Sequence, residues 1–358
     1  MRSLIPLILL LALGGCTFQE PLDIPIASGT LPTLGIAFPP VADAEQRALT
    51  LEALSDLCTR QVRLAQPWGL REPERDRFVW GPLDRRFQSL ESAGVEVLLT
   101  LELKGLPDWL DSLSQGEQEA EFREYVRALL DRAGPSLTAI QFGNEWTWEL
   151  DRYVGGDVDA FVTFATVLAE EVARRPVTGR PEVVLGSFSI GGLHGLAFLQ
   201  GRIDNVYFGD TPLYADQQLE EARANGDAAL ERYRTIVGSI PYSAIDLHFY
   251  DDVWNWPTYR EAIDQLLVES GRDPQRIQFV ASEFGGPHPT LEPAGEAFAA
   301  RRIRQYAEVL GQIGIERAYV FKLVEEPGAD IAHPNSFLID AELRRTASFT
   351  SFQDLSCG

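Results

Sequence analysis

The segment Ile140–Trp146, IQFGNEW, decides the fold of this chain. It closes a short β-rich run, and the polar pair Asn144 and Glu145 stands at the end of that run. Further β-rich runs alternate with segments of helical periodicity, which is typical of a parallel sheet with crossover helices. The eight runs are predicted over residues 34–38, 61–65, 95–101, 139–142, 183–188, 244–249, 278–282 and 317–321.

Eight β/α units in about 330 residues predict the α/β class and a single (β/α)8 barrel over residues 31–358. Helices are expected between the strands over residues 44–58, 116–132, 158–174, 259–270 and 295–310. The alternative is an open doubly wound sheet, which normally carries a glycine-rich phosphate loop after its first strand. The sequence has no such loop there, so the closed barrel is favoured.

One large insertion, residues 191–243, interrupts the alternating pattern. It begins at Gly191 and Gly192, a pair that predicts a turn. An acidic helix is expected around residues 217–237. We expect the insertion either to decorate the rim of the barrel or to overhang the site as a lid.

The N-terminal residues predict export rather than domain structure. Arg2 followed by an apolar run over residues 4–13 is typical of a bacterial signal peptide, and the run is too short to cross a bilayer about 30 Å thick. The run ends in LGGC, residues 13–16, which resembles the lipobox of bacterial lipoproteins. That resemblance implies a signal peptide over residues 1–15, lipidation of Cys16, and a tether over residues 16–30 that anchors the exported protein to a membrane of the cell envelope. An ordinary cleaved signal is the alternative.

The formal net charge of −22 bears on possible partners. So acidic a surface disfavours nucleic acid and other anionic polymers, and it favours neutral or cationic ligands. Acidity also serves solubility alone, so the charge does not select one ligand.

Three cysteines occur, and lipidation of Cys16 would leave Cys58 and Cys357. Export permits a disulfide between them. We expect this bond because they fall in the first helix and just beyond the last, which are neighbours when a barrel closes. The cysteines and histidines show no metal-ligand spacing, so neither a metal nor a cofactor is expected. Three isolated histidines are predicted as surface or loop residues: His194, His288 and His333.

Two glutamates stand at the ends of predicted strands. Glu145 follows the fourth run, and the seventh ends in FVASEFGG, residues 279–286, which places Glu283 just before two glycines. Functional groups of (β/α)8 barrels lie at the C-terminal ends of strands, and strands four and seven face each other across the barrel mouth. Such a carboxyl pair suits glycoside cleavage, in which one group protonates the leaving oxygen and the other attacks the anomeric carbon. A single strand-end glutamate is more often solvated or ion-paired, so the prediction depends on the pair.

The order of the runs, the Asn-Glu pair at strand four and the glutamate at strand seven resemble clan A of the glycoside hydrolases. The resemblance covers nearly the whole chain after the predicted anchor. It implies that Glu145 is the general acid/base, that Glu283 is the nucleophile, and that Asn144 binds the sugar 2-hydroxyl. The implied activity is a retaining glycosidase acting on β-linked poly- or oligosaccharides.

Three further residues match positions of the clan. Arg63 on the second run stands where the clan carries an arginine beside the nucleophile, and a nearby guanidinium favours an ionised carboxylate. His248 and Tyr250 on the sixth run share one face of the strand because side chains alternate with a period of two. Tyr250 is expected to donate a hydrogen bond to Glu283. The alternatives are a structural ion pair for Arg63 and packing for Tyr250.

Tryptophans follow several predicted strand ends, which is typical of carbohydrate subsites because sugar C–H faces stack on aromatic rings. We expect subsites from this group, although some members would be core: Trp68, Trp109, Trp146, Trp148, Trp254 and Trp256. Trp80, which precedes the third run, is predicted as core. The clan commonly carries a tryptophan at strand eight, but this chain reads AYVFKLVEE over residues 318–326. Phe321 or Lys322 takes that place, and Lys322 with Glu325 and Glu326 is expected to supply polar contacts.

Two function hypotheses remain from different classes: a retaining glycosidase, and a non-catalytic carbohydrate-binding surface lipoprotein built on the same barrel. Fold does not separate them. The presence of both glutamates with Asn144 and Arg63 favours the enzyme, because a binding relic would be free to lose any of them. A purely structural envelope lipoprotein would leave the tryptophans unexplained. We expect the protein to be a monomer.

Overall fold

The computed structural model describes residues 30–153, 156–205, 207–208, 211–212, 220, 223–224, 226–250, 253–286, 295–325 and 337–358. The predicted signal peptide, Cys16 and all of the tether before residue 30 lie outside these ranges, as do His288, Glu326 and His333. Within the ranges, no helix is both long enough and apolar enough to cross a membrane.

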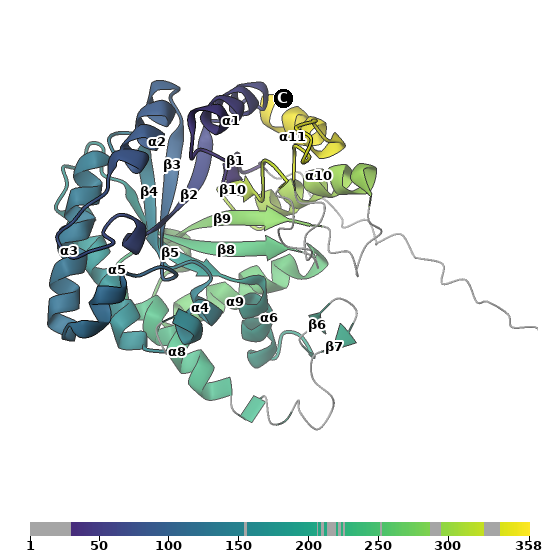
Figure 1. The fold of residues 1–358 in the computed structure, drawn as a ribbon. Helices are drawn as coiled ribbons and strands as arrows, with labels where there is room; N and C mark the ends of the chain where they lie inside the picture. The colour runs from purple at the N-terminus through teal and green to yellow at the C-terminus, as the bar shows by residue number, and fades with distance from the viewer. Residues whose placement is uncertain are drawn as a thin grey trace, which may run out of the picture.

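Eight parallel strands close into one barrel, with the helices arranged around it (Figure 1). The strand order around the barrel is β1-β10-β9-β8-β5-β4-β3-β2. The strands are β1 (Thr33–Ala37), β2 (Gln61–Pro67), β3 (Glu96–Glu102), β4 (Leu137–Phe142), β5 (Glu182–Phe188), β8 (Ala244–Tyr250), β9 (Gln278–Gly285) and β10 (Arg317–Val320). Every predicted run overlaps one of these strands, so the single (β/α)8 barrel is confirmed and the open sheet is wrong.

The helices of the described residues include all five predicted ones, which correspond to α1, α3, α5, α9 and α10. Their bounds are α1 (Ala44–Asp56), α2 (Gly81–Ser92), α3 (Gln115–Arg132), α4 (Trp146–Tyr153), α5 (Val158–Ala173), α6 (Ile190–Leu199), α8 (Gly226–Ser239), α9 (Trp256–Glu269), α10 (Glu296–Gln312) and α11 (Ala347–Cys357). Short 3-10 helices are η1 (Trp68–Leu70), η2 (Asp108–Ser112), η3 (Val253–Asn255) and η4 (Pro274–Arg276).

The predicted turn at Gly191 and Gly192 is wrong, because both glycines lie in α6. Ser189 caps this helix by accepting a 3.1 Å hydrogen bond from the Gly192 amide, and such a cap offsets part of the low helix propensity of glycine. A Cβ atom at Gly192 would come within 2.5 Å of Thr147 Oγ1, so glycine allows α6 to approach α4 closely. His194 in the same helix is buried and packs against Tyr259 at a ring distance of 5.0 Å, so its prediction as a surface or loop residue is also wrong.

The rest of the insertion contains a short hairpin, β6 (Tyr207–Phe208) paired with β7 (Thr211–Pro212), and then α8. Helix α8 overlaps the predicted acidic helix over residues 226–237. It contacts α5 and α9, so it belongs to the outer ring of barrel helices and does not overhang the site.

The barrel interior changes from apolar to polar toward the C-terminal ends of the strands. Its apolar layer is made mostly of small residues and contains Leu98, Ala139 and Ala244. Because side chains alternate along a strand, the same face of β8 continues from Ala244 through Asp246 to His248, and both of these polar side chains are fully buried. The interior therefore supports a buried polar site at one end.

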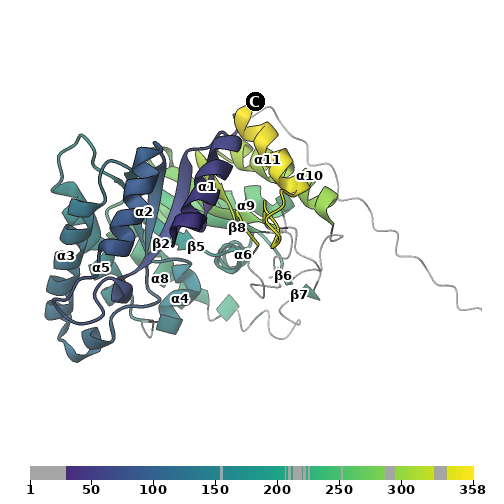
Figure 2. The same cartoon turned by 45° about the horizontal axis from the view of Figure 1, so that its top comes forward.

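The disulfide between Cys58 and Cys357 is present, with the two Cα atoms 5.1 Å apart. Cys58 lies just after α1 rather than within it, and Cys357 is the last residue of α11. Figures 1 and 2 show α1 and α11 side by side. The Ser356 hydroxyl also donates a hydrogen bond of 2.5 Å to the Leu57 carbonyl. The end of α1 and the C-terminal helix α11 are therefore joined by covalent and polar contacts.

Candidate active site

Glu283, near the end of β9, lies between two hydrogen-bond donors. Nη1 of Arg63 donates to Oε1, and the Tyr250 hydroxyl donates to Oε2 at 2.6 Å. Arg63 is fully buried, and Glu283 is nearly so. Burial and the neighbouring Glu283 charge raise the pKa of Tyr250 well above its usual value, so its hydroxyl retains the proton that it donates. The expected contacts of Arg63 and Tyr250 with Glu283 are therefore present.

Arg63 reaches the site from β2 and connects three strands. Its Nε donates to Thr100 Oγ1 on β3 at 2.9 Å, and its Nη2 donates to Asn144 Oδ1 beyond β4 at 2.5 Å. Burial works against the guanidinium charge, but the Coulombic effect of Glu283 and its other acidic neighbours raises the pKa of Arg63. The arginine is thus a charged, fixed member of the site.

Glu145 lies in the connection from β4 to α4 and has an unusual backbone conformation. Its φ angle is 44°, in the left-handed region that few residues other than glycine adopt, and such conformations concentrate at functional sites. The Glu145 amide donates to Ser187 Oγ at 2.8 Å, which holds this conformation. His248 Nδ1 lies 2.9 Å from Glu145 Oε1, so a residue of β8 contacts the carboxylate directly.

The two predicted catalytic carboxylates are close together. One oxygen of Glu145, one of Glu283 and one nitrogen of His248 all lie within 4.8 Å of one another. Retaining glycosidases have carboxyl groups about 5–5.5 Å apart, whereas inverting enzymes leave about 6.5–9.5 Å for a water molecule. The spacing suits attack by one carboxylate and proton transfer by the other.

His248 is a buried cation in this arrangement. Burial alone would lower its pKa, but Glu283, Asp246 and Glu145 outweigh burial and raise the pKa of His248 to about 10. Its Nε2 lies 3.1 Å from Ser282 Oγ, which donates to Asp246 at 2.5 Å. In the protonated imidazole both nitrogens donate, Nδ1 to Glu145 Oε1 and Nε2 to Ser282 Oγ.

Sequence reasoning missed Asp246 and Ser282. Ser282 contacts the Nε2 side of the His248 ring and in turn bonds to Asp246. Asp246 is fully buried; burial opposes its charge, but His248, Arg63 and Ser282 outweigh that effect and lower its pKa. The Ser282 amide also donates to Asp246 at 2.7 Å. Asp246 could have been found, because it stands two residues before His248 on the same strand face.

Two more carboxyl groups near Asn144 were also missed. Glu102 is the last residue of β3, and burial raises its pKa although Arg63 and Lys104 oppose that rise. Glu149 lies in the first turn of α4 and accepts a 3.3 Å hydrogen bond from Asn144 Nδ2. The strand-end rule that selected Glu145 would also have selected Glu102, whereas nothing in the sequence distinguishes Glu149.

Three tryptophans predicted to form subsites belong to the core instead, so those predictions are wrong: Trp68, Trp146 and Trp256. Each is the first residue of a helical segment that follows a strand, namely η1, α4 and α9. The start of these helices turns the indole toward the packed interior of the protein. There Trp68 stacks on Tyr125 at 5.2 Å, and Trp146 Nε1 donates to the Gly186 carbonyl at 2.7 Å.

The other tryptophans differ in exposure. Trp80 is buried, as predicted. Trp109 is half-buried, edge-on to Trp68, and donates its indole proton to the Glu72 carbonyl. Trp254 is 46% exposed and remains available to a ligand. The side chain of Trp148 lies outside the described part of the chain.

Phe321, one of the two residues expected at the place of the strand-eight tryptophan, directly follows β10. Its ring meets Tyr250 edge-on at 6.0 Å and Phe38 edge-on at 6.0 Å. Phe38 has a φ of 48°, and the Arg63 guanidinium lies 4.7 Å from its ring centre. Lys322 lies beside Phe321, with Nζ 5.6 Å from the ring centre. These aromatic rings form an apolar wall next to Glu283.

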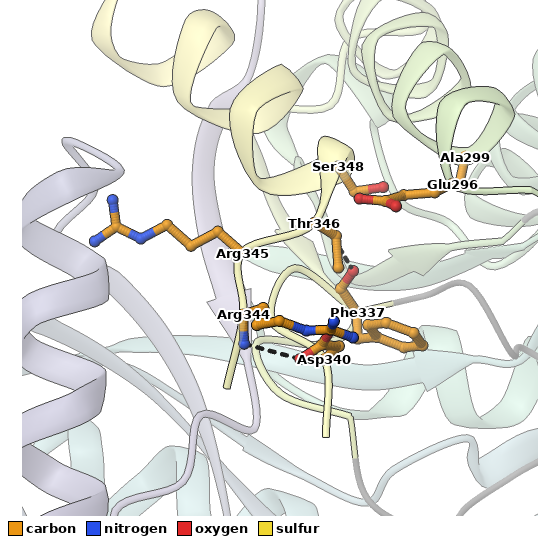
Figure 3. A pocket seen from close by; sticks show the side chains of 8 residues that line it. All are labelled: Glu296, Ala299, Phe337, Asp340, Arg344, Arg345, Thr346 and Ser348. Atoms are coloured by element: carbon orange, nitrogen blue, oxygen red, sulfur yellow. Dashed lines mark hydrogen bonds and ion pairs between the residues drawn. The ribbon is translucent and has the colours of Figure 1, made fainter. Parts of the chain in front are cut away.

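Two pockets are lined in part by residues that follow β1 or β10 in the chain. One, of about 540 Å³, is lined by Phe38, Leu49 and Glu325 among others, so it adjoins the apolar wall. The second lies between α10 and residues 337–348 (Figure 3). It contains none of the predicted site residues, and within it Arg344 pairs with Asp340.

Comparisons with known proteins identify the fold. The chain matches no protein-family model and no curated protein sequence. It is similar to the solved structure of an exo-beta-1,4-mannosidase from Opitutaceae bacterium strain TAV5, at 14% identity and a TM-score of 0.60, over 92% of this chain and 59% of that one. It is similar to a family 10 glycoside hydrolase from Paenibacillus barcinonensis, at 12% identity and a TM-score of 0.59, over 91% of this chain and 95% of that one.

A third similar structure is a family 39 glycoside hydrolase from Bacteroides cellulosilyticus WH2, at 12% identity and a TM-score of 0.61, over 92% of this chain and 64% of that one. The chain thus spans less than two thirds of the mannosidase and of the family 39 enzyme. At sequence identities this low, the structural similarity shows a shared fold and no more. The structural neighbours include glycoside hydrolases of families 5, 10 and 39, and this chain shares the eight-stranded barrel fold of their clan, clan A.

Proposed function

We propose that this protein is a retaining glycoside hydrolase that cleaves β-linked glycans. The observation that carries the proposal is the pair Glu145 and Glu283, whose carboxylate oxygens approach within 4.8 Å. Glu283 accepts hydrogen bonds from Arg63 and Tyr250, which suits an ionised nucleophile. The glycoside hydrolases that share the fold support the same class of reaction.

In the first step, Glu283 attacks the anomeric carbon while Glu145 gives its proton to the departing glycosidic oxygen. The bond between the anomeric carbon and that oxygen breaks, and an ester forms between the sugar and Glu283. The Glu145 carboxylate that results is stabilised by the charged His248 at 2.9 Å. In the second step, Glu145 takes a proton from water, the water oxygen attacks the anomeric carbon, and Glu283 is released.

The substrate is a poly- or oligosaccharide, and the apolar wall supports this part of the proposal. Phe38, Phe321 and Tyr250 present ring surfaces beside Glu283, and apolar ring surfaces suit the C–H faces of a sugar. Exposed Trp254 is a further stacking residue at the strand ends. The net charge of −22 agrees with a neutral or cationic glycan rather than an anionic one.

We also propose that the protein is an exported monomer anchored to an envelope membrane through lipid on Cys16. The support is the LGGC segment after a short apolar run. Labelling cells with a radioactive fatty acid tests the anchor. The intact chain should incorporate label and fractionate with membranes, and Cys16→Ser should do neither. Label in the Cys16→Ser variant would reject the proposed attachment site.

A screen of residues 31–358 against 4-nitrophenyl β-glycosides and β-linked polysaccharides tests the activity. Proton NMR of the first product formed distinguishes the two stereochemical courses. A β-anomer that appears before mutarotation supports the double displacement, whereas an α-anomer contradicts it. Saturable binding of a polysaccharide without any cleavage would favour the non-catalytic carbohydrate-binding protein instead.

A further inference from the structure

Glu149 is a buried carboxyl group for which the proposed reaction has no use. The residue is only 5% exposed, in the first turn of α4, one helical turn beyond Glu145. Its Oε1 accepts the hydrogen bond from Asn144 Nδ2 at 3.3 Å. Its Oε2 is buried and has no hydrogen-bond partner among the described residues. Burying a carboxyl group in this way costs stability, which suggests that the residue has a function.

The contact with Glu149 bears on how Asn144 presents its amide. A side-chain amide has one accepting oxygen and one donating NH2 group, so its orientation follows from its partners. Arg63 Nη2 donates to Oδ1, and Glu149 accepts from Nδ2 on the other side. With these two contacts, Oδ1 stays toward Arg63 and the second proton of Nδ2 is left for a ligand.

The charges around Glu149 determine the pH range in which its hydrogen bond with Asn144 is strongest. Burial, opposed by the Asn144 hydrogen bond and reinforced by Glu102 and Glu145, raises the pKa of Glu149 to about 7. The N-terminus of α4 favours the ionised form, and Arg63 lies beyond Asn144. An ionised carboxylate accepts a stronger hydrogen bond than a neutral acid does. The hydrogen bond from Asn144 to Glu149 therefore becomes stronger as pH rises through about 7.

We propose that Glu149 is a positioning residue that orients the Asn144 amide so that its second Nδ2 proton points to the 2-hydroxyl of the bound sugar. This inference rests on the proposed glycosidase function and on the role that the clan resemblance implies for Asn144. Hydrogen bonds to the sugar 2-hydroxyl strengthen in the transition state. Loss of Glu149 should therefore lower kcat more than it raises KM.

Two variants test this positioning with a matched pair of substrates. Glu149→Leu removes the acceptor, whereas Glu149→Gln keeps an oxygen that can accept from Nδ2 but cannot ionise. The substrates are the 4-nitrophenyl β-glycoside that the screen identifies and its 2-deoxy analogue. Glu149→Leu should lose about tenfold or more in kcat on the 2-hydroxyl substrate with KM within about threefold, and Glu149→Gln should recover most of the loss.

The 2-deoxy analogue separates positioning from general damage to the fold. It has no 2-hydroxyl for Asn144 to bind, so Glu149→Leu and the wild type should cleave it at nearly equal rates. An equal loss on both substrates, or no recovery in Glu149→Gln, would overturn the inference.

A second measurement does not depend on activity. The chain has five asparagines, so selective 15N labelling gives few side-chain amide signals, and loss of one signal in Asn144→Asp identifies Asn144. That signal should shift with pH through a midpoint near 7 in the wild type, and Glu149→Gln should lack this transition. An inactive wild type that shows the transition rejects the proposed function alone, whereas an active wild type without it rejects the contact.

Discussion

Nδ1 of His248 lies 2.9 Å from Oε1 of Glu145, so the predicted acid/base is hydrogen-bonded to a buried histidine of β8, which is two strands away from β4 in the barrel order. The imidazole is held in turn by Ser282 and Asp246. A cation beside Glu145 stabilises the carboxylate that remains after proton transfer, which helps departure of the leaving group.

The pKa of His248 leads to a prediction for stability. Its pKa is raised to about 10 in the folded protein, against about 6.5 in an unfolded chain. The folded state therefore holds a proton that the unfolded state has lost between these values. The contribution is complete below about pH 6.5, and it declines until it is lost as pH rises through about 10. Urea unfolding of the wild type should show this decline, and His248→Gln should show a smaller one. Parallel profiles for the two proteins would contradict the assigned charge.

Glu283→Ala should abolish turnover of every substrate, whatever its leaving group. Without the nucleophile no glycosyl–enzyme ester forms, and kcat should fall by about a thousandfold or more. Steady-state kinetics on an aryl glycoside with an activated leaving group measure this loss. Circular dichroism should show an intact fold, and substantial remaining activity would reject the proposed nucleophile.

Glu145→Ala should behave differently from Glu283→Ala. An activated aryl leaving group needs little protonation, so the first step should largely survive while the slow second step causes a burst of released phenol. Azide attacks the trapped ester without a general base, so it should restore turnover and give a glycosyl azide of the β configuration. If azide has no effect on Glu145→Ala, or rescues both variants equally, the assigned roles are wrong.

Reducing the bond between Cys58 and Cys357 should destabilise the barrel. The bond spans 299 residues, and the chain-entropy model assigns a loop this long at most about 5 kcal/mol. Thiol titration of denatured, unreduced Cys16→Ser protein should find no free thiol, and two free thiols would disprove the bond. The variant Cys58→Ser/Cys357→Ser should lose stability in urea without losing activity, because neither cysteine lies at the site.

The tryptophans give a matched pair for separating core from subsite. Trp146→Ala should lower the free energy of unfolding by about 3–5 kcal/mol, because the side chain is fully buried. Trp254→Ala, at an exposed position, should change stability by about 0.5 kcal/mol or less and should raise KM for a long glycan. Urea unfolding and steady-state kinetics measure both. If Trp146→Ala is as stable as the wild type and has a raised KM, Trp146 contacts the substrate and its assignment to the core is wrong.

The sequence by itself was enough to predict the barrel and the two glutamates at its mouth, although it did not reveal Asp246, Ser282, Glu102 or Glu149. Strand and helix periodicities are local, so each predicted run overlaps a strand in the structure. Parallel strands end at the same edge, and this rule selected Glu145 and Glu283, whereas the resemblance to clan A added Arg63, His248 and Tyr250. The cysteine pair followed from the closure of the barrel, which places the first and last helices side by side.

Only the tertiary structure decided where individual side chains point and what they contact. Trp68, Trp146 and Trp256 share the same sequence signal as an exposed subsite tryptophan, and the helix that each begins turns its indole into the core. The contact of Glu149 with Asn144 depends in the same way on the left-handed turn at Glu145 and the start of α4. Such directions depend on how strands and helices pack across the barrel, between residues as distant in sequence as Arg63 and Glu283, and a local pattern carries no information about that packing.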